Sequence, residues 1–458
     1  MEMYRGKIFN EEVFEQYTKK LPSTRENSLI KNGLFKNVNK YRAKFASQTG
    51  GYAIVEPIKG RIGGNPVNYD GNTDIPKGSE RDTFYQRKIA YGRANSWGEY
   101  DFSADITNEN FMAEAQEVRD YWDEQRQSTV LSILKGIFSM SGGVDGQFVS
   151  KHTYDITSAV TPTLGADSMN RAMQKALGDK KGAFDMVFTH SMVSTNLEGL
   201  NLIDFLKYTD SDGIEKELTI GQYNGKYVVV DDEMPTEDVV TTAPVYSMQI
   251  KTPAVAGDKI TIGATEFTFV ANDTDNPTAT QIKVGAGGTA SQQATNIAAA
   301  ATYTGFTITS STDKVLFTAA SGTNPDEPAI DVTQKAEDGA LVVEVTNSTP
   351  AVFVTNYTSY IFKKGFFEYE DLGLVDNKAI ELARDPYDKG GKNDLISRIR
   401  EIIVPMYISY KGNDAISPTS NDFENGSNWE LVNNAKTGSS KVYVDNKLIP
   451  LARIISRG

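Results

Sequence analysis

The longest amphipathic pattern in the chain runs from Thr107 to Phe138, a stretch without proline and with one glycine, Gly136. Apolar residues recur at intervals of three and four, which places them on one face of an α-helix. They are Phe111, Ala115, Val118, Trp122, Val130, Ile133, Leu134, Ile137 and Phe138. The opposite face is charged. The pattern predicts a helix of about 45 Å, which ends before the glycine pair at 142–143.

The residues before this helix predict extensions with little core of their own. Residues 1–45 carry few apolar anchors. Tyr52–Glu56 and Thr83–Ala90 have strand patterns and flank a long stretch rich in Gly, Pro, Asn and Asp, which is typical of a hairpin with an irregular tip. A two-stranded extension is only marginally stable alone in water. We therefore expect the arm and the hairpin to pack on neighbouring copies of the chain.

After the long helix, helical and strand patterns alternate. Asp167–Leu177 and Ser191–Tyr208 have the spacing of amphipathic helices, whereas Phe184–Thr189 and Lys226–Val230 read as strands. Further strand patterns follow near the C-terminus, at 352–370, 379–384, 397–408 and 449–455. The expected fold class is α+β.

Between Val245 and Pro350 the composition changes: the segment is rich in Thr and Ala and contains neither Trp nor Arg. Short strand patterns surround Gly263, a hairpin is expected to turn at Thr312–Asp313, and one short helix follows Thr289, which is spaced from Gln292 as in a capping box. The segment therefore predicts a small β-rich domain with one helix, inserted into the main domain.

Composition and charge narrow the possible functions. The 458 residues include no cysteine and two histidines, which excludes disulfides and thiolate metal sites. No apolar run is long enough to cross a bilayer. The net charge of −13 argues against a general nucleic-acid binder. Residues 1–45 nevertheless hold ten Lys and Arg against five Glu, a net of +5, whereas residues 245–350 hold five Lys against eleven Asp and Glu, a net of −6.

Patterns that suggest chemistry are incomplete. Asp70, Asn72 and Asp74 have the spacing of the first calcium-loop ligands, but Ile75 and Arg81 stand where Gly and Glu are required. His190 precedes Ser191 at a strand-to-helix junction without a nucleophile motif, which favours a structural helix cap. We predict no catalytic, cofactor or metal site, and no enzyme.

Several stretches agree in order and spacing with one known family. Before the insert they are RANSWGEYDFSADI, RDYWDEQRQSTVLSILKGIF, FDMVFTHSMVSTNLEGLNLIDF and IGQYNGKYVVVDDEMP; after it they are SYIFKKGFFEYE, ARDPYDKGG and SPTSNDFENGSNWELV. Together they resemble the major capsid proteins of tailed bacteriophages. The resemblance covers most of residues 1–245 and 351–458.

The resemblance implies the Hong Kong 97-like capsid fold, with the small β-rich domain inserted into it. The implied segments are an N-terminal arm (1–48), an E-loop hairpin (49–98), a peripheral domain with the spine helix (99–159), a first axial-domain part (160–245), the inserted domain (246–350), a second axial-domain part (351–412) and a return to the peripheral domain (413–458).

The function implied by the resemblance is a structural one. Hexamers and pentamers of the chain would close into an icosahedral shell that packages double-stranded phage DNA, assembled in the bacterial host cytoplasm and found in the virion capsid. The implied partners are further copies, a portal protein at one vertex and DNA bound without sequence preference, with no membrane. Because Met1 precedes only a short arm, we expect a separate scaffolding protein and no cleavage of the chain.

Candidate assembly contacts follow from charge and location. They are Arg61, Arg81, Arg87 and Lys88 on the hairpin, with Glu117, Asp123 and Glu124 on the long helix of a neighbour. Covalent crosslinks occur in part of the family, and Lys59, Lys77 and Lys88 are candidates by location alone. We expect the basic arm to face DNA and the acidic insert to project outward.

Two alternatives stay open. One is an encapsulin-like shell that encloses cargo enzymes instead of DNA. The other is a carbohydrate-binding adhesin in which the insert holds the sugar. The insert has few aromatic side chains for stacking on sugars, and strand alternation predicts that several of them point into its core; they are Phe267, Phe269, Tyr303, Phe306 and Phe317.

Overall fold

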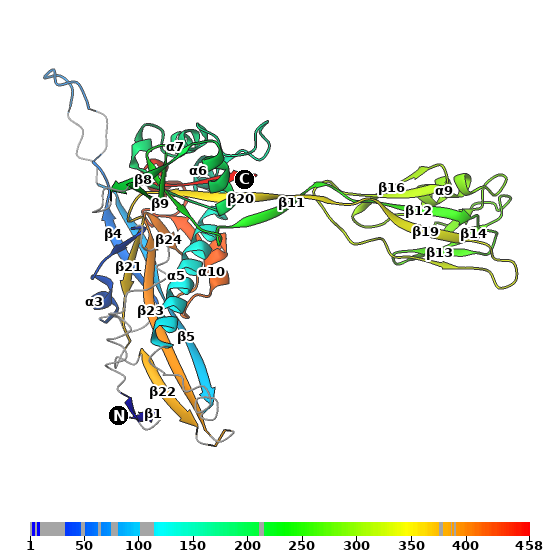
Figure 1. Cartoon of the computed structure of the whole chain (residues 1–458). Coiled ribbons are helices and arrows are strands. Elements are labelled where there is room, and N and C mark those ends of the chain that lie inside the picture. The colour runs from blue at the N-terminus through cyan, green and yellow to red at the C-terminus, as the bar shows by residue number, and fades with distance from the viewer. Residues whose placement is uncertain are drawn as a thin grey trace. The chain divides into compact units, whose positions relative to one another are not determined.

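The computed structural model describes residues 2–4, 7–9, 33–46, 51–62, 66–74, 81–100, 114–209, 215–374, 379–385, 387–388 and 391–458. The chain divides into two compact units (Figure 1). Unit 1 comprises Met1–Pro235 and Tyr357–Gly458, and unit 2 comprises Thr236–Asn356. The insert predicted at 246–350 lies within unit 2.

The long helix of unit 1 is α5, Glu114–Phe138, and its predicted first residues, 107–113, lie outside the described part. Its buried face carries the predicted apolar residues from Val118 to Phe138. Gly136 has a specific role there, because a Cβ at this position would lie 1.8 Å from the Phe423 carbonyl oxygen. Glycine therefore lets the short helix α10, Ser420–Glu424, lie directly against α5.

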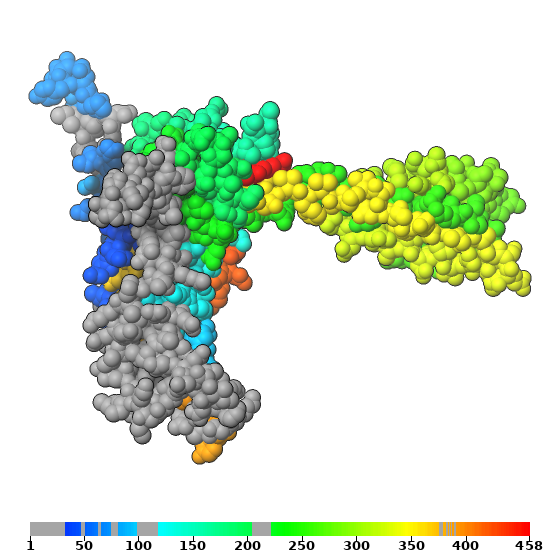
Figure 2. Space-filling model, in the orientation of Figure 1, coloured from blue at the N-terminus to red at the C-terminus, as the bar shows by residue number. Residues whose placement is uncertain are grey.

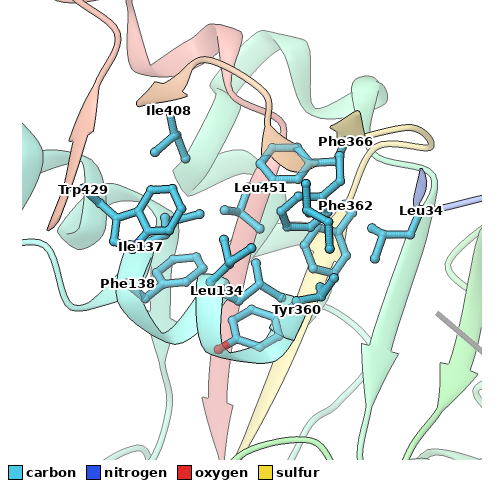
Figure 3. Close-up of a cluster of buried hydrophobic side chains, with 14 of the residues drawn as sticks. Leu34, Leu134, Ile137, Phe138, Tyr360, Phe362, Phe366, Ile408, Trp429 and Leu451 are labelled. Carbon is cyan, nitrogen blue, oxygen red and sulfur yellow. The ribbon is translucent and has the colours of Figure 1, made fainter. Parts of the chain in front are cut away.

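The main core of unit 1 forms around the second half of α5 (Figure 3). Leu134, Ile137 and Phe138 pack there against Tyr360, Phe362 and Phe366 from the middle of the chain and Trp429 and Leu451 from its end. All of these side chains are less than 5% exposed. The core thus joins segments that lie on both sides of unit 2 in the sequence.

One sheet of unit 1 is mixed, in the strand order β6-β26-β20-β7-β10-β9-β8. β7 (Met186–Thr189) pairs parallel with β10 (Lys226–Val230) and antiparallel with β20 (Val352–Phe362). Helix α7, Ser168–Leu177, buries its predicted apolar face in the core cluster on this sheet and ends at Gly178. Helix α8, Ser191–Gly199, contributes Val193 and Leu197 to the same cluster.

The other large sheet of unit 1 has the order β3-β21-β23-β5-β4, with β22 on β23. The burial of β23 (Lys392–Pro405) alternates from residue to residue in its first half, and most of its second half is buried. Its odd positions, such as Leu395 and Ile403, share core clusters with α5, whereas Ile402 and Val404 pack with the short helix α3 (Tyr41–Ala46). The period of two thus places α5 and α3 on opposite faces of this sheet.

The bounds of the remaining elements of unit 1 complete its description. They are β1 (Glu2–Tyr4), β2 (Lys7–Phe9), β3 (Phe35–Asn37), β4 (Ala53–Lys59), β5 (Thr83–Tyr100), α6 (Gly143–His152), β6 (Thr153–Asp155), η2 (Gly178–Ala183), β8 (Ile203–Thr209), β9 (Glu215–Tyr223), β21 (Phe367–Asp371), β22 (Ile380–Asp385), β24 (Ile408–Tyr410), η4 (Gly426–Asn428), β25 (Trp429–Leu431), η5 (Gly438–Ser440), η6 (Asn446–Leu448) and β26 (Leu451–Ser456).

The helix predicted over Ser191–Tyr208 is wrong in its second half. α8 ends at Gly199, Asn201 adopts a left-handed φ of 53°, and the following residues form strand β8, which pairs with β9. The apolar spacing of Leu197, Leu200 and Ile203 fits either structure locally. Strand pairing decides the outcome, and Leu200 is 56% exposed.

Two further details differ from the prediction. Residues 143–152 form helix α6, which the sequence patterns do not predict; Gly142 is its N-cap and His152 its last residue. The strand predicted at Ser397–Ile408 starts earlier and is interrupted, because Tyr407 has a φ of 59° and separates β23 from β24.

Unit 2 contains two four-stranded sheets, β16-β17-β12-β19 and β15-β14-β13-β18, and one helix, α9. Their bounds are β12 (Val245–Thr252), β13 (Lys259–Ile262), β14 (Thr265–Val270), β15 (Gln281–Lys283), α9 (Ala290–Ala300), β16 (Phe306–Ser311), β17 (Lys314–Ala319), β18 (Ile330–Thr333) and β19 (Val342–Thr349). Both sheets and α9 supply one shared core cluster. Thr289 caps α9 by accepting from the Gln292 amide, but the predicted capping box is only half formed, since the Gln292 side chain donates to Asn296 at 3.3 Å. Thr312 forms the expected turn with a φ of 52°.

Unit 2 also begins and ends in an antiparallel ribbon. Strand β11, Thr236–Thr242, pairs with β20. The Thr241 hydroxyl donates to the Val352 carbonyl at 3.1 Å, and the Thr355 hydroxyl donates to Asp238 at 2.6 Å. Val352 and Phe353 are about half exposed on this ribbon.

Candidate assembly surfaces

The predicted hairpin is present in unit 1. β4 and β5 pair antiparallel from Ala53 opposite Ile89 to Lys59 opposite Thr83. Beyond the paired region, Ile62 is 87% exposed and Tyr69 is 91% exposed, and Val55 on β4 is 58% exposed. Residues 66–74, light blue in Figure 2, belong to this tip. Large apolar side chains this exposed on a narrow extension mark a surface that another molecule can cover.

A buried ionic cluster fixes the root of this hairpin. We call Tyr41, Glu56, Lys88 and Glu368 the hairpin-root cluster. The Lys88 ammonium, 3% exposed, donates to Glu56, to the Tyr41 hydroxyl at 2.6 Å and to Glu368 at 3.4 Å. Lys44 pairs with Glu56 at 3.0 Å and Lys40 with Glu368 at 3.1 Å from the more exposed side. The cluster ties the hairpin, α3 and β21 together.

The electrostatics of the cluster favour ionised carboxylates. Burial opposes ionisation of Glu56, but hydrogen bonds from Lys88 and Lys44 lower its pKa to about 2. Burial also acts against Glu368, whose pKa is nevertheless lowered by bonds from Tyr41 and Lys40. Burial lowers the pKa of Lys88, and the two carboxylates oppose that effect. Burial and the adjacent carboxylates raise the pKa of Tyr41, which therefore stays a hydroxyl donor.

Glu370 anchors the start of α3 from a distant strand. Its carboxylate accepts from the backbone amides of Lys40, Tyr41 and Arg42 at 2.9, 2.7 and 2.9 Å. These amides have no partner within the helix, and a negative charge is favourable at this end. The described part of the arm is therefore held by β21, more than 300 residues later in the chain.

A second buried network attaches α5 to the sheet that carries the hairpin. The Arg126 guanidinium donates two bonds to Glu401 of β23, at 2.8 and 2.6 Å, and one to Asp123 at 2.5 Å. Tyr91 and Tyr369 donate to the same Glu401 carboxylate at 3.0 and 2.9 Å. Glu401 is 1% exposed, so these donors replace the water that its carboxylate loses on burial.

The predicted assembly residues fall into two groups in the structure. Lys88 is enclosed in the hairpin-root cluster. Arg87 donates to the Gly412 carbonyl at 3.0 Å and pairs with Asp414 at 2.7 Å. Asp123 bonds to Arg126. Each of these three residues therefore has a partner in the same chain, and Lys88 in particular is not accessible to a neighbour in this conformation.

The other group lies on the surface or outside the described side chains. Arg61, Arg81 and Glu124 are exposed, and the Arg81 side chain donates to the Gly60 carbonyl across the hairpin. Glu117 lies on the α5 backbone, but its side chain is outside the described part. Intersubunit contacts of these residues stay predictions. Of the crosslink candidates, Lys59 ends β4 and Lys77 lies outside the described residues.

Sequence reasoning missed Tyr41, Glu368, Glu370 and Glu401. The segment FFEYED alternates apolar and acidic positions, which placed its acids on one face of a strand, but no local signal showed what they would meet. Most of their partners lie 275 to 330 residues away, the exceptions being Lys88 for Tyr41 and Tyr369 for Glu401. Only the paired sheet brings them together.

The two histidines and Asp70 have structural roles. His190 caps α8, as predicted, by accepting from the Met192 amide at 3.2 Å. His152 is 1% exposed and its Nδ1 lies 2.5 Å from the Leu451 carbonyl oxygen. Asp70 accepts from the backbone amides of Asn72 and Thr73 and forms a turn. No helix in the described ranges is long and apolar enough to cross a membrane.

By sequence, no protein family and no curated protein matches the chain. By structure it is similar to phage capsids. The capsid of Ralstonia phage GP4 is 8% identical, with a TM-score of 0.41, 96% of this chain and 94% of that chain being covered. The capsid of Helicobacter pylori bacteriophage KHP30 is 10% identical, with a TM-score of 0.40 and coverages of 93% and 87%.

The chain resembles bacteriophage capsid proteins over most of its length. A capsid of a native GTA particle is similar too, at 9% identity and a TM-score of 0.35, with 84% of this chain and 89% of that chain covered. All three likenesses are distant.

Proposed function

We propose that this chain is the major capsid protein of a tailed bacteriophage, with a Hong Kong 97-like fold, and that it is not an enzyme. Hexamers and pentamers of it assemble into an icosahedral shell around double-stranded DNA. The proposal assigns the arm to 1–48, the E-loop to 49–98, the peripheral domain to 99–159 and 413–458, the axial domain to 160–245 and 351–412, and the insert to 246–350.

One observation carries the proposal: the hairpin is rigidly anchored at its root and uncovered at its tip. The hairpin-root cluster immobilises its base, at a desolvation cost that a merely flexible loop would not require. Its tip exposes Ile62 and Tyr69 almost completely. Covering such side chains contributes about 1.5–3 kcal/mol for each large apolar group. A fixed extension with an apolar end is suited to reach across a neighbouring subunit.

The partners in this proposal are further copies of the chain, a separate scaffolding protein during assembly, a portal protein at one vertex, and packaged DNA. An encapsulin-like shell is the alternative within the same fold. The contents of purified particles separate the two, since nuclease-protected DNA supports the capsid and a copurifying enzyme without DNA supports the cargo shell.

The test changes only the hairpin tip. The double variant Ile62→Asp/Tyr69→Asp places two charges on an apolar surface that a neighbour would cover, and Val342→Asp changes an exposed apolar residue of unit 2. We expect the tip variant to fold with an unchanged unfolding midpoint but to form no closed particles in negative-stain microscopy. The unit 2 variant should assemble. Normal particles from the tip variant would refute the role of the hairpin.

Unit 2 supports a second, additional role in binding a neutral saccharide. A cavity of about 810 Å³ opens at the β13–β14 turn and is lined by uncharged residues, including Tyr303, Phe306, Thr265 and Thr302. The other three aromatic candidates, Phe267, Phe269 and Phe317, are buried in the core. Aromatic faces beside hydroxyl groups suit sugar rings.

Glycan binding by the full chain tests this role directly. We expect Phe306→Ala to abolish retention on a neutral glycan array and Phe353→Ala, an exposed aromatic change on the ribbon of unit 2, to preserve it. Absence of any glycan retained by the unaltered chain would reject the role.

A further inference from the structure

A pocket of about 300 Å³ opens in unit 1 beside strand β23. Along one side of this strand, β21 pairs with it as far as Glu401, and β22 pairs with it from Ser397 onward. The residues between these two pairings, 398–400, belong to the lining of the pocket. The pocket therefore occupies the gap that the two strands leave along β23.

The lining of this pocket combines an apolar part with a strongly basic one. Val118, Trp122 and Ile380 belong to one core cluster, and each is less than 8% exposed. Five of the fifteen arginines of the chain also line the pocket, and they come from α3, α5 and β23: Arg42, Arg119, Arg126, Arg398 and Arg400. An apolar pocket with a few convergent charged groups is the usual form of a site for a small ligand.

Two of these arginines are neutralised by carboxylates. Arg126 donates to Glu401 at 2.6 Å, and Arg398 donates to Glu381 at 2.9 Å. Arg119 has interactions of its own as well. These three side chains shape the pocket, but their charges do not require a ligand.

Arg42 and Arg400 are different, because within the described part of the chain neither guanidinium has a hydrogen-bond acceptor or an ion-pair partner. The Arg400 guanidinium lies over the ring of Phe45, 5.5 Å from its centroid. Phe45 follows Arg42 by three residues on α3, which places both on the same face of that helix. A guanidinium over an aromatic face keeps its N–H donors available to a ligand.

We propose that this pocket binds a small phosphate monoester, with the phosphate held by Arg42 and Arg400 and the organic body against Trp122 and its apolar neighbours. A dianionic phosphate offers three terminal oxygens and can accept from two guanidinium groups at once. One bidentate guanidinium, in contrast, already occupies both oxygens of a carboxylate. The apolar lining favours an organic body over a bare anion. The site belongs to unit 1 and does not depend on the proposed capsid function.

Among the described residues that line the pocket, Asp371 is the one acid. Its Oδ1 accepts from the Gly373 amide at 2.9 Å, and its side chain is exposed. Its charge opposes a bound anion, although solvent and salt screen it. Removing this charge without removing the side chain should therefore strengthen phosphate binding, an effect that a purely structural role of the pocket would not produce.

Isothermal titration calorimetry of the full chain at fixed ionic strength tests the proposal, with phenyl phosphate as the probe. We expect one phenyl phosphate to bind per chain, inorganic phosphate and benzoate to bind more weakly, and phenol not to bind. Arg42→Gln/Arg400→Gln should weaken phenyl phosphate binding by about 10–100-fold, because it removes hydrogen bonds to a charged group. Asp371→Asn should strengthen it.

Lys180→Gln/Lys181→Gln is the matched control. It removes two positive charges from an exposed turn of the same unit and should leave binding unchanged. If the double arginine variant does not fold, Arg42→Gln alone, a change of an exposed side chain, takes its place. The proposal is overturned if phenyl phosphate does not bind, if inorganic phosphate, benzoate or phenol binds equally well, if Asp371→Asn weakens binding, or if the lysine variant loses as much affinity as the arginine variant.

Discussion

Replacing Lys88 by methionine tests the hairpin-root cluster most sharply. The change removes the buried ammonium but keeps most of the side-chain volume. Loss of one partner from a fully buried ion pair costs about 3–5 kcal/mol. Here Glu56 and Glu368 are 23% and 25% exposed, and each keeps a second lysine, at 3.0 and 3.1 Å. We therefore expect Lys88→Met to lower the free energy of unfolding by about 2–3 kcal/mol.

Lys44→Met is the matched control. It removes an ammonium from the same carboxylate, but the Lys44 side chain is 44% exposed, and such pairs contribute about 0–1 kcal/mol. Urea unfolding followed by tryptophan fluorescence suits both variants. All three tryptophans, Trp97, Trp122 and Trp429, belong to unit 1, so the signal reports on the unit that contains the cluster.

We also expect Lys88→Met to change how the free energy of unfolding depends on pH. The pKa of Glu56 falls from its usual 4.5 to about 2 in the folded chain. A carboxyl with a lowered folded pKa stabilises fully above its unfolded pKa and loses that contribution as the pH falls toward the folded one. The unaltered chain should therefore lose stability between about pH 5 and pH 2, and Lys88→Met should lose less. An equal effect of Lys88→Met and Lys44→Met at pH 7 would refute the reasoning.

Four further predictions follow from single contacts. Gly136→Ala should destabilise unit 1 by about 3 kcal/mol or more, because its Cβ would meet the Phe423 carbonyl oxygen at 1.8 Å, whereas Gly182→Ala, with no atom within 4 Å, should be near neutral in thermal unfolding. Asp258→Ala should lower the stability of unit 2 by about 3 kcal/mol, because the Asp258 carboxylate accepts from four backbone amides. Hydrogen exchange at the Lys335, Ala340 and Leu341 amides should become faster, and unchanged exchange would contradict the prediction. Burial lowers the pKa of His152 to about 4, so the free energy of unfolding should fall by about 3 kcal/mol as the pH is lowered from above 6.5 to 4. In urea unfolding, the stability of His152→Asn should depend less on pH over this range. Deletion of residues 236–356 should leave unit 1 folded by tryptophan fluorescence, because the Thr358 amide donates to the Pro235 carbonyl at 3.0 Å and a short linker can join the two ends.

The sequence predicts elements well where one face of an element is buried. The apolar stripe of α5, the α7 face that ends at Gly178 and the turn at Thr312 all have local signals, and all three are present. The signal fails where helix and strand spacings coincide. Leu197 to Ile203 fits both, and the pairing of β8 with β9 decides between them.

The candidate assembly surface could be predicted only in part. The glycine-rich composition indicated an exposed hairpin tip, and Ile62 and Tyr69 are exposed there. The partners of the charged residues could not be predicted from the sequence. Lys88 on β5 looked available on charge and location alone, but strand alternation turns it inward to Glu56 and to Glu368, 280 residues away. Such a partner depends on sheet pairing, which periodicity in one segment does not specify.

Sedimentation velocity of the purified full chain, with negative-stain microscopy of each fraction, tests the central claim most directly. The account predicts closed shells or capsomers of several copies, in which the amides of the hairpin are protected from hydrogen exchange only after assembly. A stable 50.3 kDa monomer whose hairpin and arm are already protected by its own body would contradict it.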